Sequence, residues 1–452
     1  MEKYIEINDT VLLFDNYGQD SESLHASFQA AGYDLPAAVI EDNGFLPDNV
    51  MSVYGFFLGN FKEVYGEQAR PKFFNEITVP EYWEISGNNS SGSVHDLYRE
   101  RGKIFYTEPL HKRRVKIVDW YDEKGSVRAS DHYNRYGAVY ARTTFNAKGQ
   151  KFCKSYFSAA GKEIIVENFV TKDIILNDNS EVRIFHSKTE FIVYFLERAG
   201  FGGNRIFFNS LSTPFFVSNR LTDDKKRDIL FWQEPVRDDI PGNMQVILNG
   251  QASRTAAVMV QKRQAFDKLI ALGANQDMTR RLGFVYPFAK ENGHRPEALI
   301  CTNSDNIEQC EKIVKELPDM HFCIAALTEM SSKLTDMDNY ENVSIYPGVK
   351  REILDGLFED CDFYLDINHG GEIVSAVRRA FLHNHLIFAF EETAHNRDYV
   401  AEAHIYPAKN ADRLIADIKN VMNDAEAAKA CILKQHEAAM AETAEKYAEI
   451  CK

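Results

Sequence analysis

Residues 114–170 read RVKIVDWYDEKGSVRASDHYNRYGAVYARTTFNAKGQKFCKSYFSAAGKEIIVENFV, which is the pattern of an antiparallel β-meander. Polar tips recur at Asp122–Gly125, Asn146–Gly149 and Ser158–Gly161. Each tip ends in a glycine, the residue that adopts a positive φ angle without strain. The residues between the tips are mostly Tyr, Phe, Val, Ile and Thr, which suit a half-buried pleated sheet. The pattern predicts a sheet over Arg114–Phe185 whose exposed face needs a partner or a ligand.

The sequence on either side of this sheet has the rhythm of an α/β domain. Thr10–Phe14 and Ala37–Glu41 read as buried strands that flank a helix over Ser21–Ala31, a spacing that implies parallel pairing. After the sheet, Gln245–Leu248 is predicted as a strand and Arg254–Leu272 as one amphipathic helix. The meander is therefore expected to be an insertion into an α/β domain.

A second α/β pattern follows the first, so we expect an α/β protein with two Rossmann-like domains. The predicted bounds are residues 1–65 and 186–275 for the first domain, 66–185 for the inserted β-sheet domain, 276–405 for the second domain and 406–452 for a C-terminal helical segment. Within the insertion, Ser86–Ser93 is expected to be a flexible polar loop because it is rich in Ser, Gly and Asn.

Composition excludes several classes of function. The net charge of −15 argues against a nucleic-acid partner, since phosphates call for a basic surface. The seven cysteines include no Cys-x-x-Cys pair, which fits a reducing cytoplasm. The histidines show no ligand spacing typical of a metal site, so neither a metal nor a cofactor is predicted. The N-terminus has no apolar signal core, and no apolar run is long enough to span a membrane.

Two Rossmann-like lobes followed by a C-terminal helix resemble the GT-B glycosyltransferase fold. Four segments make the resemblance more specific: Leu12–Asp20, Asn43–Pro47, Trp120–Gly125 and Lys154–Thr171. They are similar to a bacterial two-subunit O-GlcNAc transferase that modifies serine-rich repeat adhesins before export by the accessory Sec system. Within that pair the chain resembles the non-catalytic stabilising subunit, a glycosylation chaperone.

The resemblance implies two partners. One is a homologous catalytic glycosyltransferase subunit, and the other is an unfolded Ser/Thr-rich adhesin acceptor. It also implies a cytoplasmic location, with any peripheral attachment to the inner face of the membrane expected to come through partners.

The meander offers aromatic and basic residues for an extended acceptor, which main-chain and aromatic contacts bind with little regard to sequence. The predicted acceptor-binding residues are Trp120, Tyr133, Tyr136, Tyr140 and Arg142. Strand alternation sends about half of such residues into the core, and the sequence leaves open which half. Tyr136 and Arg142 are expected on one face because their separation is even.

The donor site of active relatives is expected to be degenerate here. The loop that would cradle a diphosphate is Asp15–Asp20, which has one glycine and two carboxylates. The family's pair of glutamates, spaced Glu-x7-Glu, aligns with His369 and Val377, and a valine cannot hydrogen-bond a ribose. The residues assigned to this degenerate donor site are His369, Gly370, Gly371, Glu372 and Lys290. The alternative is an active retaining glycosyltransferase that binds UDP-GlcNAc through Glu372 and Lys290.

Overall fold

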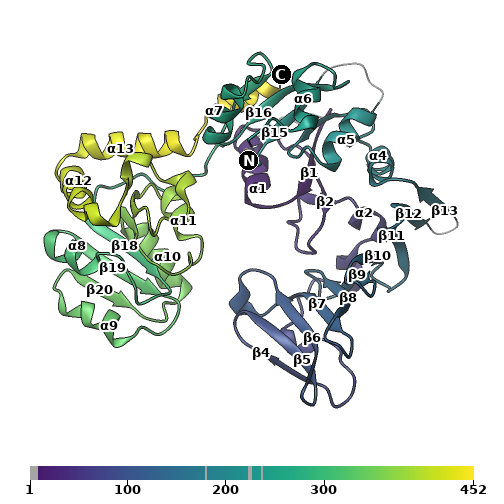
Figure 1. Cartoon of the computed structure of the whole chain (residues 1–452), viewed down its shortest axis with the longest axis horizontal. Coiled ribbons are helices and arrows are strands. Elements are labelled where there is room, and N and C mark those ends of the chain that lie inside the picture. The colour runs from purple at the N-terminus through teal and green to yellow at the C-terminus, as the bar shows by residue number, and fades with distance from the viewer. Residues whose placement is uncertain (1–8, 179–180, 222–226, 236–237, 452) are drawn as a thin grey trace. The chain divides into compact units, whose positions relative to one another are not determined.

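The structure is a computed structural model that describes residues 9–178, 181–221, 227–235 and 238–451 (Figure 1). The chain divides into two compact units. The first extends to Val260 and also includes Lys268–Arg280, and the second consists mainly of Arg281–Ile450. No helix in the described ranges is both long and apolar enough to cross a membrane.

The first unit contains a seven-stranded sheet in the order β17-β16-β15-β14-β1-β2-β3. Its pairings from β16 to β3 are parallel. The strands are β1 (Thr10–Asn16), β2 (Ala37–Glu41), β3 (Val50–Ser52), β14 (Arg205–Phe208), β15 (Asp228–Trp232), β16 (Thr255–Val260) and β17 (Thr279–Arg281). The helices that accompany it are α1 (Gln19–Ala30), α2 (Gly55–Leu58), α3 (Phe61–Tyr65), α4 (Lys188–Arg198), α5 (Thr213–Arg220), α6 (Gly242–Leu248) and α7 (Arg263–Ala271).

Two sequence predictions for this unit are wrong. Gln245–Leu248 is not a strand but belongs to helix α6, which begins at Gly242. The helix predicted over Arg254–Leu272 is in fact strand β16 followed by helix α7. The β16 residues Val258 and Val260 are fully buried. Pairing with β15 therefore overrides the helical pattern, because a strand in a parallel sheet is apolar on both faces.

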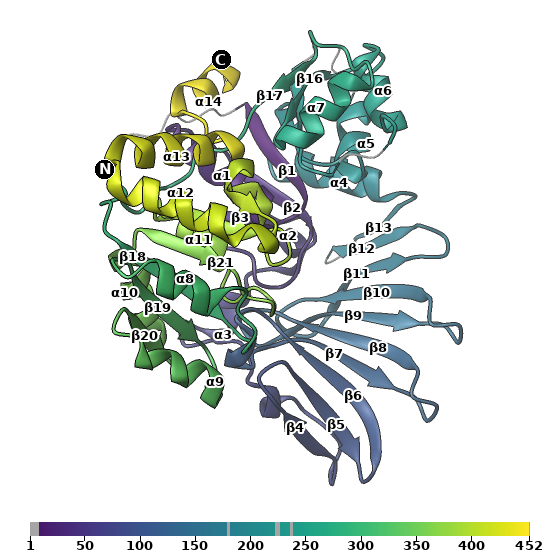
Figure 2. The same cartoon turned by 60° about the vertical axis from the view of Figure 1, so that its left-hand side comes forward.

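A ten-stranded antiparallel sheet is inserted between β3 and α4, and its strands follow one another in chain order from β4 to β13 (Figure 2). They are β4 (Glu84–Gly87), β5 (Ser91–Asp96), β6 (Arg99–Tyr106), β7 (Val115–Tyr121), β8 (Val127–Tyr133), β9 (Val139–Phe145), β10 (Lys151–Phe157), β11 (Glu163–Asn168), β12 (Ile174–Asp178) and β13 (Glu181–Phe185). The predicted turns are confirmed, since Gly125, Gly149 and Gly161 all have positive φ angles between 74° and 77°. The loop expected over Ser86–Ser93 is wrong, because it forms the β4–β5 hairpin.

The inserted sheet and the first parallel sheet are joined by side chains. The rings of Tyr54 and Tyr156 stack with their centroids 4.4 Å apart and an interplanar angle of 13°. The Tyr140 hydroxyl donates a hydrogen bond of 2.9 Å to the carbonyl of Asp42, which follows β2. These contacts hold the sheet beside the carboxyl end of β2.

The second unit contains a six-stranded parallel sheet in the order β20-β19-β18-β21-β22-β23. Its strands are β18 (Glu297–Thr302), β19 (His321–Ala326), β20 (Val343–Tyr346), β21 (Phe363–Asp366), β22 (Leu386–Phe390) and β23 (Ile405–Tyr406). Its helices are α8 (Cys310–Glu316), α9 (Ser332–Thr335), α10 (Arg351–Asp360), α11 (Ala376–Leu382), α12 (Ala411–Asn423), α13 (Ala425–Ala438) and α14 (Ala444–Cys451). Alternate residues of β18 enter two separate hydrophobic clusters, so both faces of this sheet are covered. The α/β class with an inserted antiparallel sheet is thus confirmed.

Candidate functional site

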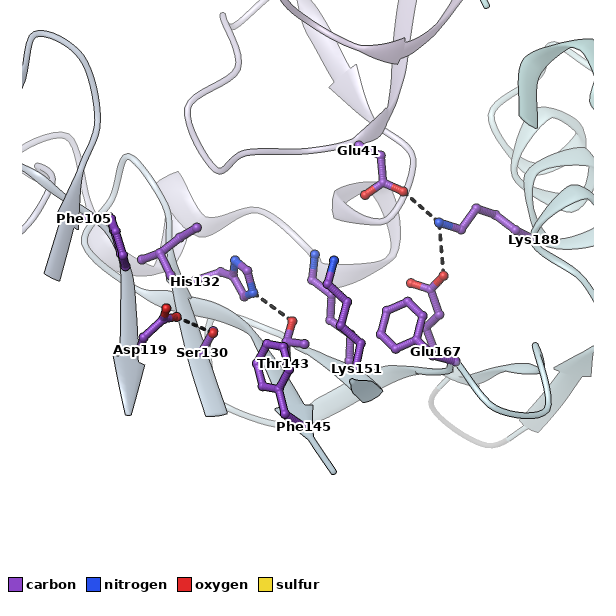
Figure 3. A pocket seen from close by; sticks show the side chains of 13 residues that line it. Glu41, Phe105, Asp119, Ser130, His132, Thr143, Phe145, Lys151, Glu167 and Lys188 are labelled. Carbon is purple, nitrogen blue, oxygen red and sulfur yellow. Dashed lines mark hydrogen bonds and ion pairs between the residues drawn. The ribbon is translucent and has the colours of Figure 1, made fainter. Parts of the chain in front are cut away.

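A cavity of about 520 Å³ lies where the carboxyl end of β2 meets the inserted sheet (Figure 3). Charged and hydroxyl side chains and three phenylalanines form its walls. The lining residues are Glu41, Phe105, Ile117, Asp119, Ser130, His132, Thr143, Phe145, Lys151, Lys154, Glu167, Phe169 and Lys188. Such a mixture of apolar walls and a few convergent polar groups is typical of a ligand site.

Lys188 closes one side of this cavity by bridging two carboxylates (Figure 3). Its Nζ lies 2.7 Å from Glu41 Oε1 and 3.1 Å from Glu167 Oε1. Burial raises the pKa of Glu41, but the ammonium of Lys188 outweighs it and the pKa is lowered overall. Burial likewise lowers the pKa of Lys188, and the two carboxylates reverse the shift. Glu41 and Lys188 are therefore both charged at neutral pH.

Lys154 and Lys151 are cationic groups of the cavity that are still available to a ligand. Lys154 Nζ lies 4.8 Å from the centroid of the Tyr156 ring, and it makes no hydrogen bond or ion pair with the residues that the structure describes. Burial lowers the pKa of Lys154. His132 beside it is neutral, because burial and then the nearby lysines lower its pKa to about 3, and its Nε2 lies 2.9 Å from Thr143 Oγ1.

The sequence prediction missed this cavity. Lys151 and Lys154 are three positions apart, which in a regular strand places their side chains on opposite faces. An irregularity in the β9–β10 pairing between Lys151 and Cys153 changes this, and both lysines line the cavity. The remaining contributors, Glu41 and Lys188, come from elements outside the sheet. The turns that end in glycine predicted the sheet, but they did not predict the irregularity in the β9–β10 pairing.

Two of the predicted acceptor residues lie on the opposite face of the sheet from the cavity. Trp120 follows the cavity residue Asp119, and Arg142 precedes the cavity residue Thr143, so strand alternation points both away. Both bind Asp131. Trp120 Nε1 donates a hydrogen bond of 2.8 Å to Asp131 Oδ2, and Arg142 makes a bidentate ion pair at 2.5 and 2.9 Å.

Of the other three predicted acceptor residues, Tyr133 belongs to the hydrophobic cluster against which Trp120 packs. Tyr133 and Tyr140 are buried, each with 4% of its surface exposed. Tyr136 lies in the turn between β8 and β9, where its ring stacks on Phe61. Tyr136 and Arg142 therefore do not share a face through strand alternation as we expected, because Tyr136 is not part of a strand.

The loop after β21 carries most of the predicted degenerate donor site, and its polar groups bind residues of neighbouring segments. His369 Nε2 lies 2.6 Å from Glu308 Oε2, and the carbonyl of Gly370 lies 2.6 Å from His395 Nε2. Glu372 Oε1 accepts a hydrogen bond of 2.9 Å from the backbone N–H of Val377. A Cβ atom at Gly370 would lie 1.8 Å from Asn303 Oδ1, so a larger residue would have to displace that side chain, whereas Gly371 has more room.

The structure separates Lys290 from this loop. Lys290 Nζ donates hydrogen bonds of 2.6–2.7 Å to the carbonyls of Glu359 and Cys361 and to Asp362 Oδ1. Asp362 precedes β21, whereas His369 follows it, so the two residues lie at opposite ends of the strand. Lys290 stabilises the amino end of the sheet and does not belong to a donor site at the carboxyl end.

Neither the position that would face a ribose nor the helix start that would face a diphosphate has the chemistry to bind a nucleotide. The side chain of Val377 is fully buried in a hydrophobic cluster and has no polar atom. Helix α1 has carboxylates in its first turn, Asp20 and Glu22, where a diphosphate would need an uncompensated helix N-terminus. Burial raises the pKa of Asp15 at the end of β1.

Models of known families match four segments of the chain. They are the GtfB N-terminal domain at residues 11–57, the GtfB middle domain at 83–186, the GtfB third domain at 188–272 and the GftB/GlyA-F C-terminal domain at 298–435. The UDP-N-acetylglucosamine–peptide N-acetylglucosaminyltransferase stabilizing protein GtfB of Streptococcus agalactiae is 43% identical, over 97% of this chain and 98% of its own. The chain belongs to the GtfB family.

Two further GtfB comparisons agree with this membership. The stabilizing protein GtfB of Streptococcus gordonii is 42% identical over 91% of each chain. A chain in the crystal structure of a GtfA/B complex bound to UDP and GlcNAc has a TM-score of 0.91 and 41% identity, covering 97% of this chain and 98% of that one. The resemblance found in the sequence is confirmed, and the GtfB relatives are named as stabilizing proteins of the transferase.

Proposed function

We propose that this GtfB protein is the non-catalytic, acceptor-binding and stabilising subunit of a cytoplasmic peptide O-GlcNAc transferase. It would act with a homologous catalytic glycosyltransferase subunit on a Ser/Thr-rich adhesin acceptor, and any membrane attachment would come through its partners. The observation that carries the proposal is the contrast between two places in the chain. The inserted sheet has an open cavity with an available ammonium, whereas the polar groups of the loop after β21 already have protein partners.

The loop after β21 offers little to a sugar nucleotide. His369, Glu372 and the carbonyl of Gly370 already have partners within 2.9 Å. A ligand would have to break these contacts before it could use the same groups, and each broken hydrogen bond costs about 0.5–1.5 kcal/mol net. Val377 supplies nothing in return.

The cavity suits an extended, hydroxyl-rich chain. The phenylalanines Phe105, Phe145 and Phe169 provide apolar walls, and the ammonium of Lys154 can donate to main-chain carbonyls. A disordered acceptor loses conformational entropy when it binds. Contacts with its backbone can offset this loss for any sequence, because every sequence has the same backbone. Because Tyr133 and Tyr140 are buried, we place the acceptor on the cavity face and not on the face of Trp120 and Arg142.

Replacing Lys154 tests this assignment in the intact two-subunit complex. Lys154→Met keeps the length of the side chain but removes its three donors, so the dissociation constant for a fluorescent Ser/Thr-rich peptide should rise at least fivefold in an anisotropy titration. Lys148→Met is the matched control, because Lys148 is exposed in the turn between β9 and β10. Co-purification with the catalytic subunit should be unchanged for both variants.

Equal affinities for the Lys154→Met and Lys148→Met complexes would contradict the assignment of the cavity. A second variant examines the loop after β21. His369→Ala should leave glycosylation by the complex nearly unchanged, because the histidine serves only the contact with Glu308. A loss of more than about tenfold, or roughly 1.4 kcal/mol, would mean that the loop takes part in catalysis.

A further inference from the structure

Three side chains of different chemistry meet at the amino ends of β18 and β19 in the second unit. Glu297 is the first residue of β18, His321 is the first residue of β19, and Cys323 follows two positions later. Each offers one ligand atom, and these atoms all lie within 4.8 Å of one another. The parallel register causes the meeting, since Glu297 pairs with His321 and Leu299 pairs with Cys323.

The three donors are those of a zinc-type cation. A thiolate, an imidazole and a carboxylate bind Zn²⁺ at about 2.0–2.3 Å, which sets the donors about 3.3–3.8 Å apart in a tetrahedron. The separations in the structure are all within 4.8 Å, which a change of side-chain rotamer can bring to this geometry. The soft sulfur disfavours Mg²⁺ and Ca²⁺, which prefer sites made entirely of oxygen.

The carboxylate of Glu297 lacks a counter-charge in the part of the chain that the structure describes. It is half-buried and makes no hydrogen bond or ion pair there. Two cations that precede β18 in the chain, Lys290 and Arg295, bind Asp362 at 2.7 and 2.9 Å. A divalent cation would supply this half-buried carboxylate with the counter-charge that the described residues do not provide.

Neighbouring groups hold two of the three donors in place. His321 Nε2 lies 3.0 Å from Ser344 Oγ on β20, which orients the imidazole. The side chain of Cys361, at the end of α10, lies beside Cys323. Contacts of this kind, from groups next to the ligands, are a regular feature of metal sites in proteins.

We propose that Glu297, His321 and Cys323 bind one zinc-type divalent cation, with a water molecule as the fourth ligand. The site lies at the amino ends of the strands, whereas the loops that face ligands in open α/β sheets follow the carboxyl ends. Its role is to fasten β18 to β19, and it is independent of the acceptor cavity in the first unit. The sequence did not predict it, because Glu297 and His321 come together only through strand pairing.

Cobalt titration of the purified full-length chain tests the site after chelator treatment. The chain should bind one equivalent of Co²⁺, with a thiolate-to-cobalt charge-transfer band and the visible bands of a tetrahedral site. One equivalent of Zn²⁺ should abolish both signals. Zn²⁺ should also raise the thermal unfolding midpoint of the chelator-treated chain.

Two substitutions and one control complete the experiment. Cys323→Ala should remove the charge-transfer band, and Glu297→Gln, at a half-buried position that tolerates change, should weaken Co²⁺ binding at least tenfold. Cys301→Ala is the matched control, because Cys301 lies in β18 and is as buried as Cys323, at 4% exposure. The site is disproved if the wild-type chain shows no charge-transfer band with Co²⁺. It is equally disproved if Cys323→Ala retains the band, or if Cys301→Ala removes it.

Discussion

His395 shows how a single side chain can organise the loops of the second unit. Its Nδ1 lies 2.6 Å from Asp366 Oδ1, and its Nε2 lies 2.6 Å from the carbonyl of Gly370. Its backbone N–H also donates a hydrogen bond of 2.7 Å to Asp366 Oδ2. The residue therefore joins the loop after β22 to the end of β21 and to the loop that follows it.

The charge of His395 should make the stability of the second unit depend on pH. The hydrogen bond with Asp366 raises the pKa of His395 to about 9, whereas an unfolded histidine titrates near 6.5. Protonation therefore stabilises the folded state, fully below about pH 6.5, and the contribution is lost as the pH rises through about 9. His395→Gln should be less stable than the wild-type chain at pH 6, and this difference should shrink by pH 9.5 in thermal unfolding. His111→Gln, an exposed substitution in the inserted sheet, should show no such trend.

At the scale of secondary-structure elements, the joint between the inserted sheet and the first parallel sheet depends on Lys188. This residue starts α4 and neutralises Glu41 on β2 and Glu167 on β11. Lys188→Met should lower the free energy of unfolding by about 1–3 kcal/mol. The loss is smaller than for a fully buried pair because Glu41 is half exposed. Chemical denaturation measures the loss, and Lys188→Arg should recover most of it.

Hydrogen exchange would show whether the effect of Lys188→Met is confined to this joint. In Lys188→Met, faster exchange should be confined to β2, β11 and the start of α4. Uniformly faster exchange across the second unit as well would show that the lysine has some other role.

The sequence predicted those elements whose signals are local. The tips of the meander could be read because a polar residue starts each turn and a glycine with positive φ ends it, as at Asp122 and Gly125. The β4–β5 hairpin was missed for a tertiary reason. Gly87 and Gly92 suggested a loop, but a Cβ atom at either position would lie within 3.0 Å of the Tyr106 hydroxyl. These glycines make room for a ring that comes from another strand.

The candidate sites were harder to predict than the fold. The resemblance aligned Val377 with a ribose-binding position, and the structure buries this valine in a hydrophobic cluster. The resemblance could not show that Lys290 is held at the other end of β21 by Asp362. Nor could it identify the cavity, because Glu41 and Lys154 are brought together only by the packing of the inserted sheet on the first parallel sheet.

At the scale of the whole molecule, the isolated chain should neither bind nor hydrolyse the donor. The polar groups of the loop after β21 already have protein partners, and the start of α1 carries carboxylates, so both places oppose a sugar nucleotide. Calorimetry should therefore show a dissociation constant for UDP-GlcNAc weaker than about 1 mM. Incubation of the chain alone with UDP-GlcNAc should release no UDP. A micromolar constant, or UDP release by the isolated chain, would support the alternative of an active retaining transferase.

The strand order of the first parallel sheet also has a consequence for synthesis on the ribosome. Strand β1 lies between β2 and β14, so the sheet needs segments from both sides of the insertion. The inserted sheet pairs only neighbouring strands, and such local topologies form quickly. A nascent chain that has reached α4 can therefore complete the inserted sheet while β1 still presents an unpaired edge. Proteolysis of ribosome-bound chains of increasing length should reveal a resistant inserted sheet first, and we expect folding helpers to act on β1–β3 during that interval.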